Sequence, residues 1–390
     1  MTGEILALLR ERRDAMAAML QEIALLESPS LEPETQEPVF ARLAEGLERA
    51  GLRSRRLPGL KRPGGRTSGG QLFAVPRERR KGLPAQLLLG HCDTVWAVGT
   101  VAGGMPVEIC DGRLTGPGVY DMKAGLVQGI FALQALRDLG LEPPAEPVVF
   151  VNSDEEIGSA ESTARICRLA RRVQRVFVLE PSLGAEGRLK TARKGSARFE
   201  LTVRGRAAHS GLDPEKGASA VLELAHLILG VYGLADPGRG VTVNVGVVEG
   251  GVRRNVVAPS ARAEVDVRAL RRVDLEAVER GLRELAQGPR KVPGTSVEVQ
   301  GGMDRAPLEP TPANRALWEA AQRAARELGF ELGEGTSGGA SDGSTTSQIV
   351  ATLDGLGAVG DGAHARHEHV VVDRMPERAA LLARLMMEPV

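Results

Sequence analysis

Hydrophobic residues recur every three to four positions along several stretches of the chain. Apolar side chains at this spacing share one face of a helix, so each stretch predicts a helix. The first of these patterns ends at Ser28-Pro29, because proline does not fit a helix interior. The predicted helices span residues 2–26, 36–50, 124–138, 217–232, 275–286, 312–328 and 376–387.

Three other segments, residues 86–95, 148–158 and 175–180, begin with continuous apolar runs and end in polar residues. Short apolar runs with β-branched residues predict strands buried on both faces, as in a parallel sheet covered by helices. The carboxyl ends of such strands form the edge at which open α/β sheets bind ligands. The polar residues at these ends are His91, Asp93, Asp154, Glu155, Glu156 and Glu180.

The pattern changes at about residue 192, where apolar and polar residues begin to alternate. Alternation predicts strands with one face in water. Together with two helices, these strands follow the order strand-helix-strand-strand-helix-strand, which is the ferredoxin-like arrangement. We therefore expect an α/β fold: a catalytic domain with a mixed, mostly parallel sheet, interrupted by a ferredoxin-like α+β domain. The expected bounds are 1–192 and 305–390 for the catalytic domain and 193–304 for the inserted one.

Composition and charge exclude several function classes. A chain of 390 residues exceeds the ~250–300 residues that one hydrophobic core supports, which agrees with two domains. The 50 basic and 50 acidic residues cancel, so overall charge gives no attraction to nucleic acid or to an anionic membrane. Three scattered cysteines do not form a disulfide framework. The charged amino-terminal stretch fits neither a signal peptide nor a membrane span, so we expect a cytoplasmic protein.

A basic run at residues 53–66 departs from this balance. Base stacking needs aromatic side chains, and Phe73 is the only one near the run. We therefore interpret the run as a solvated loop or hairpin. A nucleic-acid-binding role would instead predict steep salt dependence of binding.

Asp154, Glu155 and Glu156 place three consecutive acids at a strand end. Three carboxylates beside a buried strand repel one another and resist desolvation, so a positive partner is expected. Adjacent side chains on an extended backbone point to opposite sides, which lets one glutamate bind a metal while its neighbour reaches a water. Taken alone, the segment also fits a solvated acidic loop. Asp121, at a loop-to-helix junction, likewise fits an N-cap.

Imidazole and carboxylate groups without thiolates favour zinc, cobalt or manganese. The candidate ligands are too many for one open zinc site and suit two divalent ions, about 3.5–4 Å apart, that share a carboxylate. Glu155 then remains as the base that takes a proton from metal-bound water, and the predicted reaction is amide hydrolysis. The five candidate ligands are His91, Asp121, Glu156, Glu180 and His364.

Several motifs resemble those of the di-zinc exopeptidases, which include glutamate carboxypeptidase of the carboxypeptidase G type, aminoacylase and succinyl-diaminopimelate desuccinylase. The resemblance covers nearly the whole chain, with the motifs in the family's order. The motifs are Leu-Gly-His-Cys-Asp-Thr-Val at 89–95, Gly-Pro-Gly-Val-Tyr-Asp-Met-Lys-Ala-Gly at 116–125, Asn-Ser-Asp-Glu-Glu-Ile-Gly-Ser at 152–159, Leu-Glu-Pro-Ser at 179–182 and Gly-Ala-His-Ala-Arg-His-Glu at 362–368.

The resemblance assigns a role to each metal ligand. It implies that Asp121 bridges two zinc ions, that His91 and Glu180 complete one ion, and that Glu156 and His364 complete the other. His367 and His369 are alternatives to His364, but the spacing of His364 to Glu368 fits the motif better.

The remaining catalytic roles also follow from the resemblance. It implies that Asp93 orients the ring of His91 and that Glu155 is the general acid/base. It further implies a cis peptide between Asp121 and Met122. In Gly205-Arg-Ala-Ala-His-Ser-Gly211, His209 matches a histidine that stabilises the oxyanion, often in the partner subunit's site. From the residues alone, a turn hydrogen bond is the alternative role for His209.

The inserted domain resembles a lid and dimerisation domain, which implies a homodimer. Asn255, Arg268, Gly339 and Ser341 match substrate-binding positions, and Arg305 either binds a substrate carboxylate or forms an ion pair. The implied reaction releases a carboxyl-terminal acidic residue from an N-acyl compound or short peptide, with glutamate carboxypeptidase as the nearest branch. Alternatives are an aminoacylase or dipeptidase of the same family and, from another class, a metal-dependent binder without catalysis.

Overall fold

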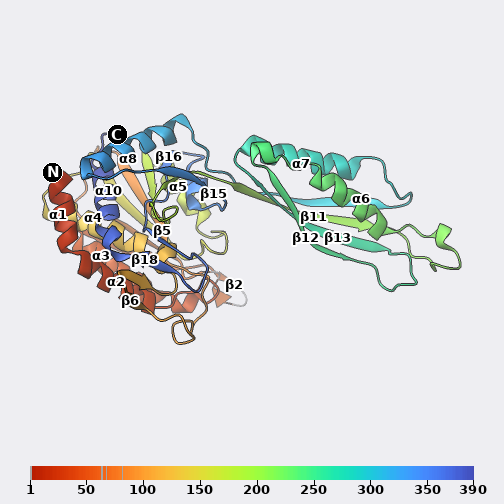
Figure 1. The fold of residues 1–390 in the computed structure, drawn as a ribbon, viewed down its shortest axis with the longest axis horizontal. Coiled ribbons are helices and arrows are strands. Elements are labelled where there is room, and N and C mark those ends of the chain that lie inside the picture. The colour runs from red at the N-terminus through yellow and green to blue at the C-terminus, as the bar shows by residue number, and fades with distance from the viewer. Residues whose placement is uncertain (1, 63–64, 67, 81) are drawn as a thin grey trace. The chain divides into compact units, whose positions relative to one another are not determined.

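The computed structural model describes residues 2–62, 65–66, 68–80 and 82–390 (Figure 1). Two units divide the chain: residues 1–191, 310–337 and 341–390 form the first, and residues 192–309 with 338–340 form the second. We expected an inserted domain at 193–304. The second unit extends five residues further at its carboxyl end and also takes in the short segment 338–340.

A mixed sheet of six strands lies at the centre of the first unit, in the order β1-β4-β8-β5-β9-β16. The neighbours β8, β5, β9 and β16 run parallel, whereas β4 runs antiparallel to both of its neighbours, β8 and β1. Strands β8 and β5 are almost wholly buried, as their continuous apolar runs predict. The strands are β1 (Leu52–Leu57), β4 (Gln71–Pro76), β5 (Ala85–His91), β8 (Glu146–Asn152), β9 (Arg175–Val178) and β16 (Ala351–Leu353).

Helices pack around this sheet (Figure 1). Helix α4 buries almost every residue, and it packs against α10 at the hydrophobic core. The predicted single helix over residues 2–26 is wrong in one respect, because the chain turns at Arg12 and forms two helices. The helices are α1 (Thr2–Glu11), α2 (Arg13–Leu25), α3 (Glu37–Arg49), α4 (Ala124–Asp138), α5 (Thr163–Ala170), α8 (Pro312–Leu328), α9 (Asp342–Thr346) and α10 (Met375–Met386).

Short strands that the hydrophobic pattern did not predict complete the first unit, and the last two residues of one of them, β10, belong to the second unit. One antiparallel sheet has the order β17-β18-β7-β6, and the loop between β17 and β18 carries His364 and Glu368. The basic run begins on the edge strand β1, where Arg53 and Arg55 are exposed, and residues 63–64 and 67 of that run lie outside the described part. The short strands are β2 (Lys61–Arg62), β3 (Gly65–Arg66), β6 (Glu108–Cys110), β7 (Arg113–Thr115), β10 (Leu189–Arg193), β15 (Glu334–Ser337), β17 (Gly360–Asp361) and β18 (His369–Val371).

Four antiparallel strands and two helices form the second unit, in the predicted element order. The sheet order is β12-β13-β11-β14, so β12 is an edge strand. Alternate residues such as Phe199 and Val265 are buried in this unit's own apolar core, which also includes residues of α6 and α7. The elements are β11 (Gly195–Arg204), α6 (Ala220–Tyr232), β12 (Thr242–Gly250), β13 (Ser260–Ala269), α7 (Arg272–Gln287) and β14 (Ser296–Arg305).

Single helical turns fill several connections. Within the described residues, none of the helices combines the length and apolar character that crossing a bilayer requires. The 3-10 turns are η1 (Pro33–Thr35), η3 (Pro214–Lys216), η4 (Pro237–Arg239) and η5 (Val372–Arg374), and η2 (Val119–Lys123) is a π-helical turn.

Candidate metal and catalytic site

The ends of three adjacent parallel strands bring the first candidate residues together. Strand β5 lies between β8 and β9, and its last residue, His91, is opposite Asn152 of β8. Leu89 is opposite Val178 of β9, so Glu180 follows β9 at the level of His91. The acids that follow β8 reach the same edge. This is the edge at which open α/β sheets bind ligands.

Asp121 reaches this edge from the turn η2, which leads into α4. The preceding Gly118 has a left-handed backbone with φ 71°, and a Cβ atom there would lie 2.4 Å from Cγ2 of Thr94. Glycine is therefore required by both conformation and space. The peptide bond between Asp121 and Met122 is cis, as the resemblance to the exopeptidases implies.

Glu368 holds this turn in place. Its carboxylate accepts hydrogen bonds from the backbone N–H groups of Gly118 (3.0 Å), Tyr120 (2.9 Å) and Asp121 (3.0 Å). The indole Nε1–H of Trp96 donates a fourth, at 2.9 Å. Burial raises the pKa of Glu368 to about 7, although these donors favour its charged form. Glu368 thus fixes the backbone that presents Asp121.

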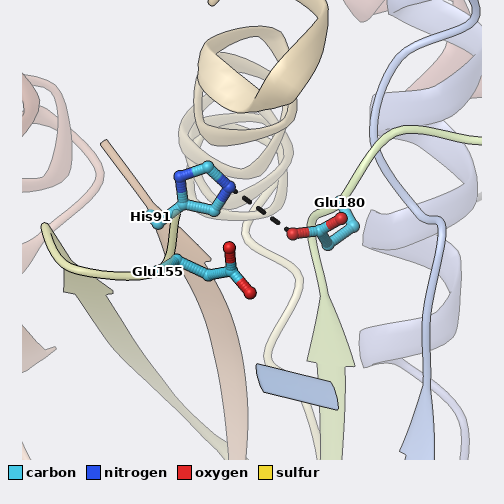
Figure 2. Close-up of side chains that lie close together, drawn as sticks. All are labelled: His91, Glu155 and Glu180. Atoms are coloured by element: carbon cyan, nitrogen blue, oxygen red, sulfur yellow. Dashed lines mark ion pairs between the residues drawn. The ribbon is translucent and has the colours of Figure 1, made fainter. Parts of the chain in front are cut away.

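His91 is buried, and its two ring nitrogens have different surroundings. Nδ1 lies 3.0 Å from the carbonyl oxygen of Asp93, which can only accept, so Nδ1 carries a proton and donates. Nε2 lies 3.4 Å from Oδ1 of Asp121 and 3.5 Å from Oε1 of Glu180. The dashed line in Figure 2 marks the contact between His91 and Glu180. Burial lowers the pKa of His91, but the carboxylates of Asp121, Asp93 and Glu180 raise it well above its usual value.

These distances fit a shared cation. Nε2 of His91 is buried and makes no hydrogen bond within the described residues. Ligand atoms about 2.0–2.2 Å from a tetrahedral metal ion are about 3.4 Å from one another. A neutral His91 would direct the lone pair of Nε2 at two carboxylates, which is unfavourable without a positive charge between them. The donor set therefore fits a divalent metal ion.

His364 lies on the other side of Asp121. Its Nε2 is 3.1 Å from Oε2 of Glu156 and 3.7 Å from Oδ2 of Asp121. The two carboxylate oxygens of Asp121 therefore face different histidines, which is the geometry a bridging ligand needs. His364 has a left-handed backbone with φ 60°, which is uncommon for a residue other than glycine. The charge and hydrogen bond of Glu156 raise the pKa of His364 to about 9, against partial burial.

Asp93 connects two of the strand ends. Its carboxylate accepts from the hydroxyl of Ser30 at 2.7 Å and from the backbone N–H groups of Glu155 (3.3 Å) and Glu156 (3.1 Å). Burial raises the pKa of Asp93, but its interactions with His91 and Ser30 outweigh burial and lower it. Asp93 thus fixes the backbone of the two glutamates as well as the ring of His91.

The side chains of His91, Glu155 and Glu180 come from three different segments and point toward a common space (Figure 2). Ligand atoms of these three lie within 4.8 Å of one another, and so do those of His91, Asp121 and Glu156. Lys190 adds a buried positive charge, with Nζ 3.7 Å from Oε2 of Glu180. Sequence reasoning missed Lys190, because it precedes the second unit in a segment without any strand-end motif.

Comparison with known proteins gives the family. Residues 87–388 match the profile of Peptidase family M20/M25/M40. The chain belongs to this family.

Individual relatives agree with the assignment. The chain is 29% identical to carboxypeptidase G2 of Pseudomonas sp. (strain RS-16) over 305 residues, which cover 77% of this chain and 73% of that one. Its fold resembles aminopeptidase PepT of Bacillus cereus, with a TM-score of 0.79, 22% identity and coverage of 96% and 98%. It also resembles a dinuclear metal-binding M20 peptidase of Bacillus subtilis, with a TM-score of 0.70, 15% identity and coverage of 96% and 97%. The protein is an M20 metallopeptidase.

Five further predicted residues of this M20 metallopeptidase, His209, Asn255, Arg268, Arg305 and Gly339, belong to the second unit. Nδ1 of His209 accepts hydrogen bonds from the backbone N–H groups of Gly211 and Leu212, both at 3.2 Å. This is the turn hydrogen bond that the residues alone suggested, and it leaves the proton on Nε2, since a neutral imidazole carries only one. The imidazole is exposed, so Nε2–H is free to act as a donor to a ligand.

The other predicted substrate-binding residues have varied surroundings. Arg268 donates two hydrogen bonds to the carboxylate of Asp266, at 2.8 and 3.0 Å. Both residues lie on the face of β13 opposite the buried core. Asn255 is exposed, and Arg305 ends β14. The carbonyl of Gly339 accepts from Arg193 at 3.1 Å. Ser341 is buried and caps α9, and its hydroxyl donates to Asp354 at 2.7 Å.

Proposed function

We propose that this M20 metallopeptidase is a glutamate-carboxypeptidase-like amide hydrolase that releases a carboxyl-terminal, acidic amino acid from an N-acyl or peptide substrate. The observation that supports the proposal is the position of Glu155 beside the five candidate ligands. Glu155, His91 and Glu180 have ligand atoms within 4.8 Å of one another, while Glu156 pairs with His364. Binding metal needs no further acid, whereas hydrolysis does.

Two zinc ions would be held on either side of Asp121, His91 and Glu180 binding one and Glu156 and His364 the other. When bound, the ions polarise the scissile carbonyl and lower the pKa of water at the site toward ~7. Cobalt and manganese accept the same nitrogen and oxygen donors. Lys190 offsets part of the negative charge on Glu180, because the two buried groups lie 3.7 Å apart.

Glu155 would accept the proton that the attacking water loses and then deliver it to the nitrogen of the leaving amine. Its backbone N–H is bonded to Asp93 at 3.3 Å, and Asp93 also contacts His91. The base and the ligand are thus positioned by one carboxylate.

The second unit would act as a ferredoxin-like lid. Its His209 has the tautomer needed to donate from Nε2 to a developing oxyanion, a contribution of about 3–4 kcal/mol when such donors are well placed. Asn255, Arg268, Arg305, Gly339 and Ser341 are the candidates for binding the substrate carboxylate. Arg268 would exchange its bonds to Asp266 for bonds to the substrate.

Hydrolysis of a substrate panel tests this proposal. N-acyl glutamates, N-acyl neutral amino acids and dipeptides should be assayed with zinc, cobalt and manganese, and N-acyl glutamates should give the highest kcat/KM. Preference for neutral amino acids would favour an aminoacylase, and preference for free dipeptides a dipeptidase.

Replacing Glu155 tests the mechanism. Glu155→Gln should keep two metal equivalents by elemental analysis and lower kcat by about 10²–10⁴-fold, the usual contribution of a general base. Glu108→Gln, which replaces an exposed glutamate outside the cluster, is a suitable comparison for expression and folding. Turnover unchanged by Glu155→Gln would refute the assigned base.

The second unit also supports a homodimer. Strand β12 is an edge strand with exposed Val247 and Val248, and α6 exposes Leu229 by 74% of its surface. Unpaired edges beside apolar surface are typical of association sites. Light scattering should give twice the 41.3 kDa chain mass, and Leu229→Asp should shift the protein toward monomers. A monomeric wild type at micromolar concentration would reject the dimer.

A further inference from the structure

The two glutamates among the candidate metal ligands present their carboxylates differently. Both oxygens of Glu156 lie close to Nε2 of His364, Oε1 at 3.2 Å and Oε2 at 3.1 Å. Glu180 directs Oε1 at Nε2 of His91, at 3.5 Å, and this contact is drawn in Figure 2. Oε2 of Glu180 lies 3.7 Å from Nζ of Lys190. Glu156 thus presents two oxygens beside its histidine, whereas one oxygen of Glu180 is paired with an ammonium group.

Lys190 and Glu180 form a buried ion pair. The two side chains are each 8% exposed. A charge removed from water needs an opposite charge or strong hydrogen bonds, so breaking such a pair is costly. The attraction between two buried charges is also stronger than that between the same charges at the surface. Lys190 therefore restrains Oε2 of Glu180 more firmly than solvent would.

A single loop after β16 fixes the backbones of both partners. The N–H of Lys190, on β10, donates to the carbonyl of Asp354 at 2.9 Å, and the N–H of Gly357 donates to the carbonyl of Glu180 at 2.8 Å. Gly355 has a left-handed backbone with φ 80°, and a Cβ atom there would lie 2.8 Å from the backbone nitrogen of Lys190. Glycine lets the loop approach this closely. The ion pair is thus preformed by the fold.

The number of carboxylate oxygens at a metal site affects which ion the site prefers. Zinc is usually held by few ligands in a tetrahedral arrangement. Manganese favours octahedral sites rich in oxygen, and bidentate carboxylates are one source of additional oxygens for such ions. A carboxylate with one oxygen held by an ammonium group supplies one oxygen instead of two. The pairing of Glu180 with Lys190 therefore favours zinc over manganese on the His91 side.

The charge of Lys190 has a separate effect, which is common to divalent ions. Like charges repel in proportion to their magnitude, so the ammonium group weakens the binding of zinc and of manganese alike. General damage to the site would also lower both affinities. The ratio of the two affinities therefore isolates the effect of Lys190 on coordination.

We propose that Lys190 sets the metal preference of the His91 side, because it holds Oε2 of Glu180 and leaves one oxygen of this carboxylate for a metal ion. The inference rests on the two metal ions of the proposed function and identifies the residue that makes one side prefer zinc to manganese. Lys190 is in this sense a positioning residue. The His364 side has no such restriction, since both oxygens of Glu156 face its histidine.

Chelator competition with zinc and with manganese tests the proposal without substrate. In His364→Ala, which removes the histidine of the other side, the affinities report the His91 side. Adding Lys190→Met, which keeps the length of the side chain but removes its charge, should raise both affinities and favour manganese more. The zinc-to-manganese affinity ratio should fall by about tenfold, the lower end of the effect that groups contacting a metal ligand have on affinity. An unchanged ratio would overturn the proposal.

Lys216→Met is the control in the same His364→Ala background. Lys216 is an exposed lysine that pairs with Asp213 in the second unit, so it shares the residue type but not the contact with a ligand. We expect the zinc-to-manganese ratio to stay unchanged. A fall equal to that in Lys190→Met would show that the ratio does not report the pairing with Glu180.

The visible spectrum of cobalt(II) gives a measurement that needs no lysine variant. Its absorption bands weaken as the number of ligands rises, so they report the coordination of the bound ion. His364→Ala with one cobalt ion should show the strong bands of a low coordination number, and Lys190→Met should weaken them. Weak, octahedral-type bands in His364→Ala itself would refute the restraint on Glu180.

Turnover and metal binding separate this inference from the proposed reaction. If no N-acyl amino acid is hydrolysed but the zinc-to-manganese ratio falls in Lys190→Met, the proposed reaction fails and the role of Lys190 stands. If substrates are hydrolysed but the ratio does not depend on Lys190, the role of Lys190 fails and the reaction stands.

Discussion

The two sides of the candidate metal centre differ in how they are supported. On the His91 side, the side chains of His91, Asp93 and Glu180 are exposed by 2%, 0% and 8%. On the His364 side, the side chain of Glu156 is 8% exposed but that of His364 is 53% exposed. His91 ends a central strand, whereas His364 lies in a loop with a left-handed backbone. The His91 side is therefore part of the buried core, whereas His364 completes the metal centre from the surface.

This difference predicts that the two sides bind their metal ions with different affinities. A ligand fixed by burial and by an orienting carboxylate loses little entropy on binding, whereas an exposed loop histidine must be ordered. The His91 side should bind its ion more tightly. The His364 side should bind its ion more weakly and exchange it faster.

Substitution of each histidine by alanine is the strongest test of the comparison. After dialysis against a weak chelator, His364→Ala should keep about one metal equivalent. His91→Ala should keep less than one, because Asp121 and Glu180 then lose their shared nitrogen partner. Both should lower kcat/KM by more than about 100-fold, because even groups that only orient a ligand contribute about 10–100-fold. Elemental analysis and kinetics measure the two effects.

His367→Ala is the matched control. It removes an exposed histidine from the same loop, and it is the alternative ligand that the sequence left open. We expect it to keep both metal equivalents. Equal metal loss from His91→Ala and His364→Ala would contradict the proposed asymmetry, and metal loss from His367→Ala would contradict the assignment of His364.

The sequence predicted the His91 side and the His364 side for different reasons. The parallel strands β5, β8 and β9 were predicted from continuous apolar runs, and the polar residues that follow them were the candidates. His364 came from its motif, since the short strands β17 and β18 leave no periodic pattern. The helix at Pro312–Leu328 was predicted from its apolar spacing with its observed bounds, and in the structure Thr311 caps its start and Gly329 ends it in a left-handed conformation.

Other features leave no signal in the pattern of residues. The turn at Arg12, which divides the first predicted helix, occurs in a polar run without glycine or proline. Glu368 was missed as a positioning residue because three of its partners are backbone N–H groups, which any residue supplies. Lys190 meets Glu180 only through tertiary structure. Such contacts depend on packing that periodicity does not describe.

Replacing Glu368 should weaken metal binding on both sides, because Glu368 fixes the turn that presents Asp121 and both sides share Asp121. In Glu368→Gln, the side-chain amide cannot accept at its nitrogen, so at least one N–H of the turn loses a strong acceptor. We expect about 10–100-fold weaker metal binding, the usual effect of removing a group that orients a ligand. The free energy of unfolding should fall by about 1–3 kcal/mol.

Glu108→Gln is the control for that substitution, since Glu108 is an exposed glutamate on β6 of the same small sheet. Denaturant unfolding and chelator competition measure stability and affinity separately. If Glu368→Gln lost stability but kept wild-type metal affinity, Glu368 would support the fold without positioning Asp121.

The pH dependence of metal binding gives a last test of the His364 side. Without a cation, Glu156 and Asp121 raise the pKa of His364 to about 9. A metal must displace this proton, so affinity should rise about tenfold per pH unit below pH 9 and level off above it. The stability of the metal-free protein should change with pH in the opposite direction. The pair of protonated His364 with Glu156 contributes its full stability below pH ~6.5. This contribution is lost as pH rises through about 9. Chelator competition from pH 6 to 9 measures the slope. The slope of log affinity against pH gives the number of protons released on metal binding, and His364→Ala should lower this number by one. An unchanged slope would mean that His91 alone releases the proton.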